Sequence, residues 1–165
     1  MAHALFESGI AALEFARKAT HGLFEDIPDN KVCHQPVPGA NHALWILGHL
    51  ACTDEFFMNK IGGKPLNRFE TWNGIFFMKS TPTPNVSDYP PVSEVKQVLD
   101  ENRQRFLQWV DSMNEADARM ALPEDLKTFA PNRATLLSTM AWHEGLHAGQ
   151  LTVIRKSLGI SPKFG

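Results

Sequence analysis

Cysteine is scarce in this chain, which has only Cys33 and Cys52 among its 165 residues. Two cysteines cannot build the disulfide framework that stabilises many small secreted domains. We therefore expect free thiols, a reducing compartment and a cytoplasmic location. The first residues, where Glu7 interrupts the apolar stretch, do not resemble a signal peptide. A chain of this length can bury its own core, so we expect a single domain over residues 1–165.

An excess of positive charge and a long apolar run are also missing. The chain has 16 Lys and Arg against 18 Asp and Glu, a formal net charge of −2 and a pI of about 6.4. Its basic residues do not cluster, which argues against nucleic acid as a partner. The longest apolar stretch, residues 43–52, is far shorter than the roughly 20 residues that span a bilayer. We therefore expect no membrane partner either.

Helical periodicity is what the sequence does contain, and it contains no convincing strand alternation. The expected helices cover residues 2–25, 41–60, 92–113 and 132–158. Four such helices imply an all-α, antiparallel four-helix bundle. We expect Asn41 and Asn132 as N-caps, and Arg17 on the outer face of the first helix. The second helix is apolar nearly all round, which predicts a place at the centre of the bundle or at a subunit contact.

The long connection between the second and third helices, residues 61–91, is unusual in a compact domain. Its aromatic residues have a spacing that suits a short helix folded over one end of the bundle. These residues are Phe69, Trp72, Phe76 and Phe77. Two interpretations remain open: the aromatic rings could wall an apolar pocket, or they could simply cover the end of the bundle.

Two histidines near the C-terminus, His143 and His147, carry the clearest chemical signal. On a helix, residues four apart project from the same face, and that face is otherwise apolar. Burying an imidazole without a partner costs roughly 2–7 kcal/mol. A bound metal ion is the simplest explanation, and histidines bonded to each other or to backbone carbonyls are the alternative.

The run from His143 to His147 also fits the His-Glu-x-x-His pattern of zinc metalloproteases, in which the glutamate acts as general base. The downstream ligands of those proteases are missing. Positions 150 and 153 are Gln150 and Val153, and no acidic residue follows Glu144. A third ligand must therefore come from upstream.

The upstream candidates are five histidines, of which one stands out. They are His3, His21, His34, His42 and His49. His49 is the strongest candidate, because it lies in the middle of the most apolar helix, where a histidine without a role would be costly. His42 lies one heptad earlier, but at the helix start, where water can satisfy it.

Residues 41–50 (Asn-His-Ala-Leu-Trp-Ile-Leu-Gly-His-Leu) and 143–151 (His-Glu-Gly-Leu-His-Ala-Gly-Gln-Leu), followed by Arg155, resemble the DinB/YfiT-like superfamily. The resemblance covers essentially the whole chain, including the helix number, the long middle connection and the order of one histidine early and two late. It implies a four-helix bundle, often a homodimer, with a divalent metal on three histidines. By the same resemblance His49, His143 and His147 are the expected metal ligands.

Three imidazoles leave coordination positions open on a metal, which is typical of a catalytic site. Zinc or nickel is the expected ion. It could lower the pKa of a bound water to about 7, or it could stabilise the thiolate of a low-molecular-weight thiol. The better understood relatives resemble the thiol case, with transfer or isomerisation of a small-molecule substrate, and others resemble hydrolases. A non-catalytic, metal-binding dimeric bundle is a third hypothesis.

Five further polar residues each have a functional and a structural interpretation. Glu144 is a tentative catalytic general base, or an exposed or hydrogen-bonding residue. Cys52 is a fourth ligand or a packing residue, and Asn102 bonds a substrate or another helix. Gln150 orients an imidazole or faces solvent. Arg155 receives an anionic substrate or is a last-turn cation favoured by the helix dipole.

Overall fold

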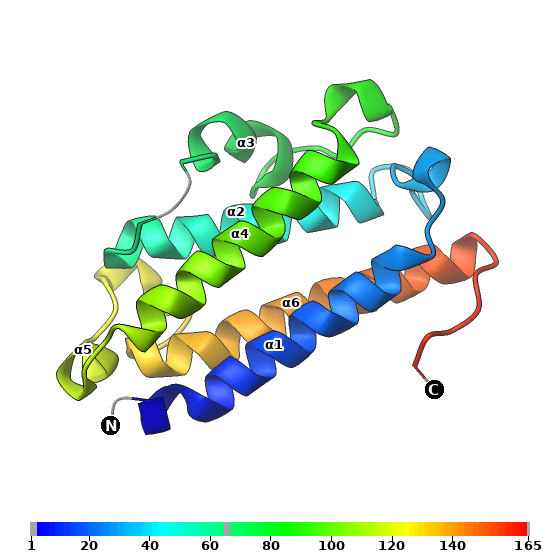
Figure 1. Cartoon of the computed structure of the whole chain (residues 1–165). Coiled ribbons are helices and arrows are strands. Elements are labelled where there is room, and N and C mark those ends of the chain that lie inside the picture. Colours follow the sequence, from blue (N-terminus) through cyan, green and yellow to red (C-terminus); the bar gives the residue numbers. More distant parts are fainter. Residues whose placement is uncertain (1–2, 65–66, 165) are drawn as a thin grey trace.

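The computed structural model describes residues 3–64 and 67–164, whose regular structure is helical apart from one isolated β-bridge, Ala121 to Asn132 (Figure 1). The four periodic stretches form four long helices, which confirms the all-α bundle; the expected start at Ala2 lies outside the described residues. These helices are α1 (His3–Glu25), α2 (Ala43–Ile61), α4 (Val92–Asp111) and α6 (Arg133–Ser157). The shorter elements are α3 (Phe69–Phe76), α5 (Glu115–Arg119) and the 3-10 turns η1 (Asp29–Lys31), η2 (Val86–Asp88) and η3 (Glu124–Leu126). None of the helices described is long and apolar enough to cross a membrane.

The two pairs of helices in closest contact, α1 with α6 and α2 with α4, run parallel (Figure 1). Along the first pair, Arg17 lies opposite Glu144 and Leu23 lies opposite Arg155. The prediction of antiparallel neighbours is therefore wrong for these pairs, although α2 does run against α6. The reason is the long connection, which carries the chain back along the bundle before α4 begins, as crossover connections do in other bundles.

The N-terminus of α2 is capped by a histidine. The imidazole Nδ1 of His42 accepts a hydrogen bond from the backbone N–H of Trp45 at 3.1 Å. The prediction of Asn41 as this cap is therefore wrong, because Nδ1 of His42, the next residue, accepts the capping hydrogen bond instead. The predicted cap of α6 is confirmed, since Asn132 accepts a hydrogen bond from the N–H of Thr135 at 3.0 Å.

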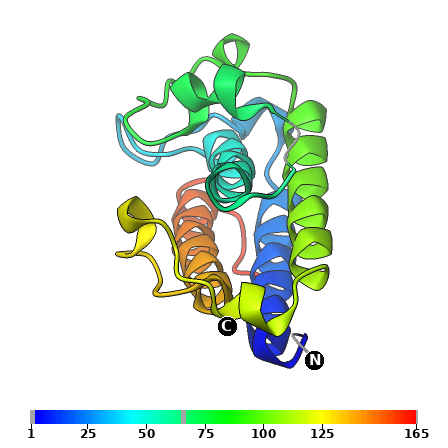
Figure 2. The ribbon, with the colours of Figure 1, turned by 90° about the vertical axis from the view of Figure 1, so that its left-hand side faces the viewer.

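Helix α2 lies at the centre of the structure. Every residue from Ala43 to Glu55 is buried, because α4, α3 and α6 all contact this helix. Figure 2 shows α2 nearly end-on, with α6 on one side and α3 on the opposite side. The all-round apolar pattern is thus explained by the chain's own fold.

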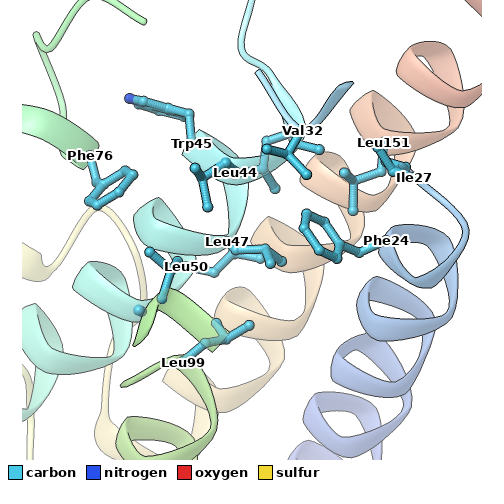
Figure 3. Close-up of a cluster of buried hydrophobic side chains, with 14 of the residues drawn as sticks. Phe24, Ile27, Val32, Leu44, Trp45, Leu47, Leu50, Phe76, Leu99 and Leu151 are labelled. Carbon is cyan, nitrogen blue, oxygen red and sulfur yellow. The ribbon is translucent and has the colours of Figure 1, made fainter. Parts of the chain in front are cut away.

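The apolar core consists of two clusters that follow one another along the helices. The first joins α1, α2, α3, α4 and α6, and Figure 3 shows Phe24 of α1 and Leu47 of α2 pointing towards each other in it. The second lies towards the other end of the same long helices. It includes Phe6, Leu13, Phe57, Phe106 and Leu136.

Four charged side chains, one from each long helix, occupy the region between the two clusters, and we call them the charge layer. Arg17 donates to Glu144 (Nε to Oε1, 2.7 Å) and to Asp54 (Nη2 to Oδ2, 3.1 Å). Arg103 donates to the same two carboxylates at 2.8 and 2.9 Å. Each side chain is at most 8% exposed. The prediction that Arg17 faces outward is wrong, because two buried carboxylates hold it inside.

The long connection does form a short helix, α3, but at a different place from the one predicted. It packs against the middle of α2 rather than over the end of the bundle (Figures 1 and 2). Gly48 makes this possible, since a Cβ atom at that position would lie 2.4 Å from the ring of Phe76. The absence of a side chain at Gly48 thus allows α3 to pack closely against the middle of α2.

Candidate metal centre

Three histidines from two helices converge on one point. His49 comes from α2, and His143 and His147 lie one turn apart on α6. Nε2 of His143 lies 3.3 Å from Nε2 of His49 and 3.2 Å from Nε2 of His147. The candidate ligand atoms of all three lie within 4.8 Å of one another. The structure therefore brings together the three residues that the sequence singled out.

The outer ring nitrogens of two of these histidines face acceptors. Nδ1 of His49 lies 2.8 Å from the carbonyl oxygen of Phe76, and a carbonyl can only accept, so the proton of this ring is on Nδ1. Nδ1 of His147 lies 3.0 Å from Oε1 of Gln150, which also accepts from Asn41. Both rings therefore aim an unprotonated Nε2 at the common point. This donor set fits a divalent cation, whose histidine ligands usually donate their second N–H in this way.

Burial keeps the three imidazoles uncharged. Loss of hydration lowers the pKa of His49 to about 3 and the pKa of His147 to about 4. The pKa of His143 is also lowered by burial, although the carboxylates of Asp54 and Glu144 oppose the shift. At neutral pH all three rings are therefore uncharged, with one ring nitrogen free of a proton, which is the state that a metal ion requires.

His49 is held in place by Trp45 of α2, which α3 and the segment after it hold in turn. The indole of Trp45 stacks on the imidazole of His49 with 4.7 Å between ring centroids and 7° between planes. Nε1 of the indole donates to the carbonyl of Ile75 in α3 at 2.9 Å and lies 3.0 Å from Oγ of Ser80, which follows α3. Sequence reasoning missed these contacts, because a backbone carbonyl carries no residue-type signal. Gly48, next to His49, was the one signal of a close approach.

A pocket of about 200 Å³ opens beside the histidines. Its walls come from α2, α6, the segment after α3 and the loop before α6. The lining residues are His49, Thr53, Phe56, Phe57, Phe77, Met78, Phe129, Thr139, Met140, Trp142 and His143. Of the aromatics predicted in the long connection, Phe77 lines this pocket, and Trp72 and Phe76 are buried against the core. The pocket interpretation is therefore correct for Phe77, whereas the prediction that the rings cover the end of the bundle is wrong, because Trp72 and Phe76 pack against the middle of α2.

A sequence model of the DinB superfamily matches residues 12–151, a range that contains all three histidines. The chain belongs to the DinB superfamily. None of the curated proteins compared with the chain matches it significantly.

Glu144 of this DinB superfamily protein lies in the charge layer and is not among the residues lining the pocket. Its Oε1 accepts from Arg17 and its Oε2 accepts from Arg103. Burial by itself raises the pKa of this carboxyl, but the two guanidinium groups outweigh it, and the pKa lies below its ordinary value. The predicted general base therefore has both oxygens bound to cations.

Three other polar residues bond to the protein itself. Nδ2 of Asn102 donates to the carbonyl of Ala51 at 3.1 Å, between α4 and α2. Cys52 packs in the first apolar cluster, and burial raises the pKa of its thiol. Arg155, 2% exposed, donates to the carbonyl of Leu23 near the end of α1. For Asn102 and Cys52 the structural interpretation describes the contacts. Arg155 fits neither of its two interpretations, because its buried guanidinium bonds to residues at the end of α1. Gln150 has the orienting position predicted for it.

Three of the remaining histidines have partners elsewhere. His21 lies 2.7 Å from Oδ1 of Asp100, and His34 lies 3.0 Å from Oγ of Ser157. His42 caps α2, and the side chain of His3 lies outside the described part of the chain. His49 is thus the upstream histidine that joins the C-terminal pair.

Proposed function

We propose that this protein is a metal-dependent enzyme that binds a divalent ion on His49, His143 and His147 and activates a small thiol for transfer to, or isomerisation of, a small-molecule substrate. The observation that carries the proposal is the convergence of three uncharged imidazoles beside a pocket. Zinc or nickel suits such nitrogen ligands. When bound, the ion would supply Lewis-acid stabilisation of a thiolate at a coordination position left open by the protein.

The chain's own residues orient the ligands and limit water. The carbonyl of Phe76 and the ring of Trp45 fix His49, and Gln150 fixes His147. The walls of the pocket are largely apolar, so a substrate bound there would displace water from this side of the site. Preorganised ligands of this kind lose little entropy when the ion binds.

Glu144 has a positioning role in this proposal. It is adjacent to His143 on α6, and its contacts with Arg17 and Arg103 tie that helix to α1 and α4. A hydrolase that used this carboxylate as its base would need a free oxygen directed at the pocket. The two arginine contacts therefore favour the thiol proposal over hydrolysis assisted by Glu144.

We also propose a homodimer, which the family resemblance implies, formed through one face of α6. Leu146 and Val153 are 49% and 57% exposed, and Gly149 lies between them at helical spacing. Nothing lies within 4 Å of a Cβ atom built on Gly149, so a second helix could approach closely there.

Both cysteines are free and buried, in agreement with a reducing compartment, and we retain the cytoplasm as the proposed location.

The decisive experiment is elemental analysis of untagged protein purified without chelator, beside a His147→Gln variant. The matched control is His34→Gln, which removes a histidine that bonds to Ser157 instead. We expect about one equivalent of zinc or nickel per chain in the parent and the control, and none in His147→Gln. Absence of stoichiometric metal after incubation with either ion would overturn the proposal.

A titration of the cobalt-loaded protein with ethanethiol then tests the reaction class. A thiolate ligand changes the absorption spectrum of the cobalt site, and this change should saturate. A metal-loaded protein whose spectrum does not respond to thiols would instead be a hydrolase or a non-catalytic metal-binding bundle.

A further inference from the structure

We propose that the pocket beside the histidines binds a neutral, ring-bearing part of the substrate, and that any ionised group of that molecule stays outside the pocket. This inference rests on the proposed function for the identity of the molecule as a substrate. The binding preference itself depends only on the pocket walls, which the protein supplies without a metal.

The first argument is the polarity of the lining. None of the pocket-lining residues described is Lys, Arg, Asp or Glu. The two hydroxyl groups already donate to main-chain carbonyls, Thr53 to His49 at 2.8 Å and Thr139 to Phe129 at 2.9 Å. An ionised group would therefore lose its hydration here without gaining a charged partner. The polar end of the pocket is the pair of imidazoles, so the reacting atom of a ligand faces them and its apolar body faces away.

The second argument is the arrangement of the aromatic rings. Phe56 lies 5.2 Å from Phe77 and 5.3 Å from Phe57, and Phe57 lies 5.7 Å from Phe129 (distances between centroids). The contacts of Phe57 with Phe56 and with Phe129 are edge-to-face, at 70° and 82°. Rings in such an array present both faces and edges, which are the surfaces that another aromatic ring prefers. A ring in the pocket would join an existing array of four aromatic rings.

The third argument is size and access. A dry cavity of roughly 150 Å³ is large enough to hold benzene. The pocket, at about 200 Å³, therefore accommodates one ring and a short substituent, and not a bulky molecule. Met78 and Trp142 line the pocket and are 62% and 64% exposed, so the pocket is reached directly from solvent. Ionised groups further along a substrate can remain in water beyond these two side chains.

The test of the pocket uses metal-free protein and isothermal titration with toluene and with benzoate. We expect saturable binding of toluene, and binding of benzoate at least about tenfold weaker, because its carboxylate must be desolvated. Thr139→Asp should weaken toluene binding by about tenfold or more. Thr139→Val, which also removes the hydrogen bond to Phe129 but adds no charge, should retain it. Equal affinity for the two probes, or no binding of toluene, would overturn the inference.

A second titration separates this inference from the proposed function. Cobalt-loaded protein is titrated with phenylmethanethiol, ethanethiol and mercaptoacetate. We expect the ring-bearing thiol to bind at least about tenfold more tightly than ethanethiol, since it adds a buried ring, and mercaptoacetate to gain nothing from its charge. Equal binding of all three thiols would contradict the pocket inference and leave the thiol function standing. Toluene binding without any response to thiols would contradict the thiol function and leave the pocket inference standing.

Discussion

The carbonyl oxygen of Phe76 lies 2.8 Å from Nδ1 of His49, and the ring of the same phenylalanine covers Gly48. Phe76, at the end of α3, therefore sets the tautomer of His49 through its carbonyl. Through its ring it also sets how closely α3 packs against α2. The long connection is part of the candidate metal centre for this reason.

Substituting Gly48 with alanine should disturb the site through Phe76. The added Cβ would lie 2.4 Å from the ring, so α3 must shift away and the hydrogen bond to His49 must lengthen. We expect a loss of about 1–3 kcal/mol in the free energy of unfolding and a metal affinity about tenfold to a hundredfold weaker. Denaturant unfolding and competition with a chelator measure the two effects. The matched control is Gly74→Ala, where the space is open; equal effects of both variants would contradict the argument.

Replacing Gln150 with alanine tests the orientation of His147. The variant removes the acceptor for Nδ1, which lies 3.0 Å away, but Gln150 is exposed and contributes little to packing. We expect metal affinity to fall about tenfold or more while the unfolding midpoint hardly changes. Gln104→Ala, an exposed glutamine on α4, should change neither. Unchanged metal affinity in Gln150→Ala would show that this contact does not orient the ligand.

Replacing Glu144 with glutamine distinguishes a positioning residue from a general base. The variant leaves Arg17 and Arg103 without one of their two carboxylates in a buried place, so we expect a loss of about 3–5 kcal/mol in unfolding free energy. The pH dependence of any remaining activity should keep its shape. The exposed pair of Glu115 and Arg119 gives the control, since Glu115→Gln should cost less than about 1 kcal/mol. Full stability with a lost acidic limb of the pH profile would instead identify Glu144 as the base.

The metal-free protein should lose stability as the pH falls from about 6.5 towards 4. The pKa is lowered by burial to about 3 for His49 and to about 4 for His147 and His42, whereas an unfolded histidine has a pKa of about 6.5. Between these values the unfolded chain binds more protons than the folded one, so lowering the pH favours unfolding. Each histidine contributes a slope of up to about 1.4 kcal/mol per pH unit. Urea unfolding with chelator at several pH values measures it. His147→Phe should give a shallower slope, and an identical slope would contradict this origin.

A charged residue on the exposed face of α6 should prevent dimer formation. Leu146→Asp and Val153→Asp each place an unpaired carboxylate in the proposed contact, so we expect a monomer by light scattering and an unchanged metal content. Phe15→Asp changes an apolar residue on α1 that is 72% exposed, and it should not alter the oligomeric state. A parent protein that is already monomeric at high concentration would refute the dimer.

The long helices and the pair of His143 and His147 could be predicted because their signals are local, whereas His49 was assigned to that pair from its place in an apolar helix and from the family resemblance. Apolar periodicity marks α1, α2, α4 and α6, and the spacing of His143 and His147 is a property of one helix turn. The pairing of Arg17 with Glu144 joins residues 127 positions apart, and no pattern of neighbouring residues in the sequence predicts it. Helix α5 has a single turn, too short to show a period. The direction of α4 was missed because it depends on the path of the long connection.

The charge layer also fixes how the long helices align along their axes. Sliding any one of them by a single turn, about 5.4 Å, would leave a buried cation or anion without its partner while the two apolar clusters tolerated the slip more easily. The layer therefore acts as a register mark that discriminates against shifted packings. Because Asp54 follows His49 on α2 and Glu144 follows His143 on α6, the packing that pairs the charges is also the one that brings the histidines together.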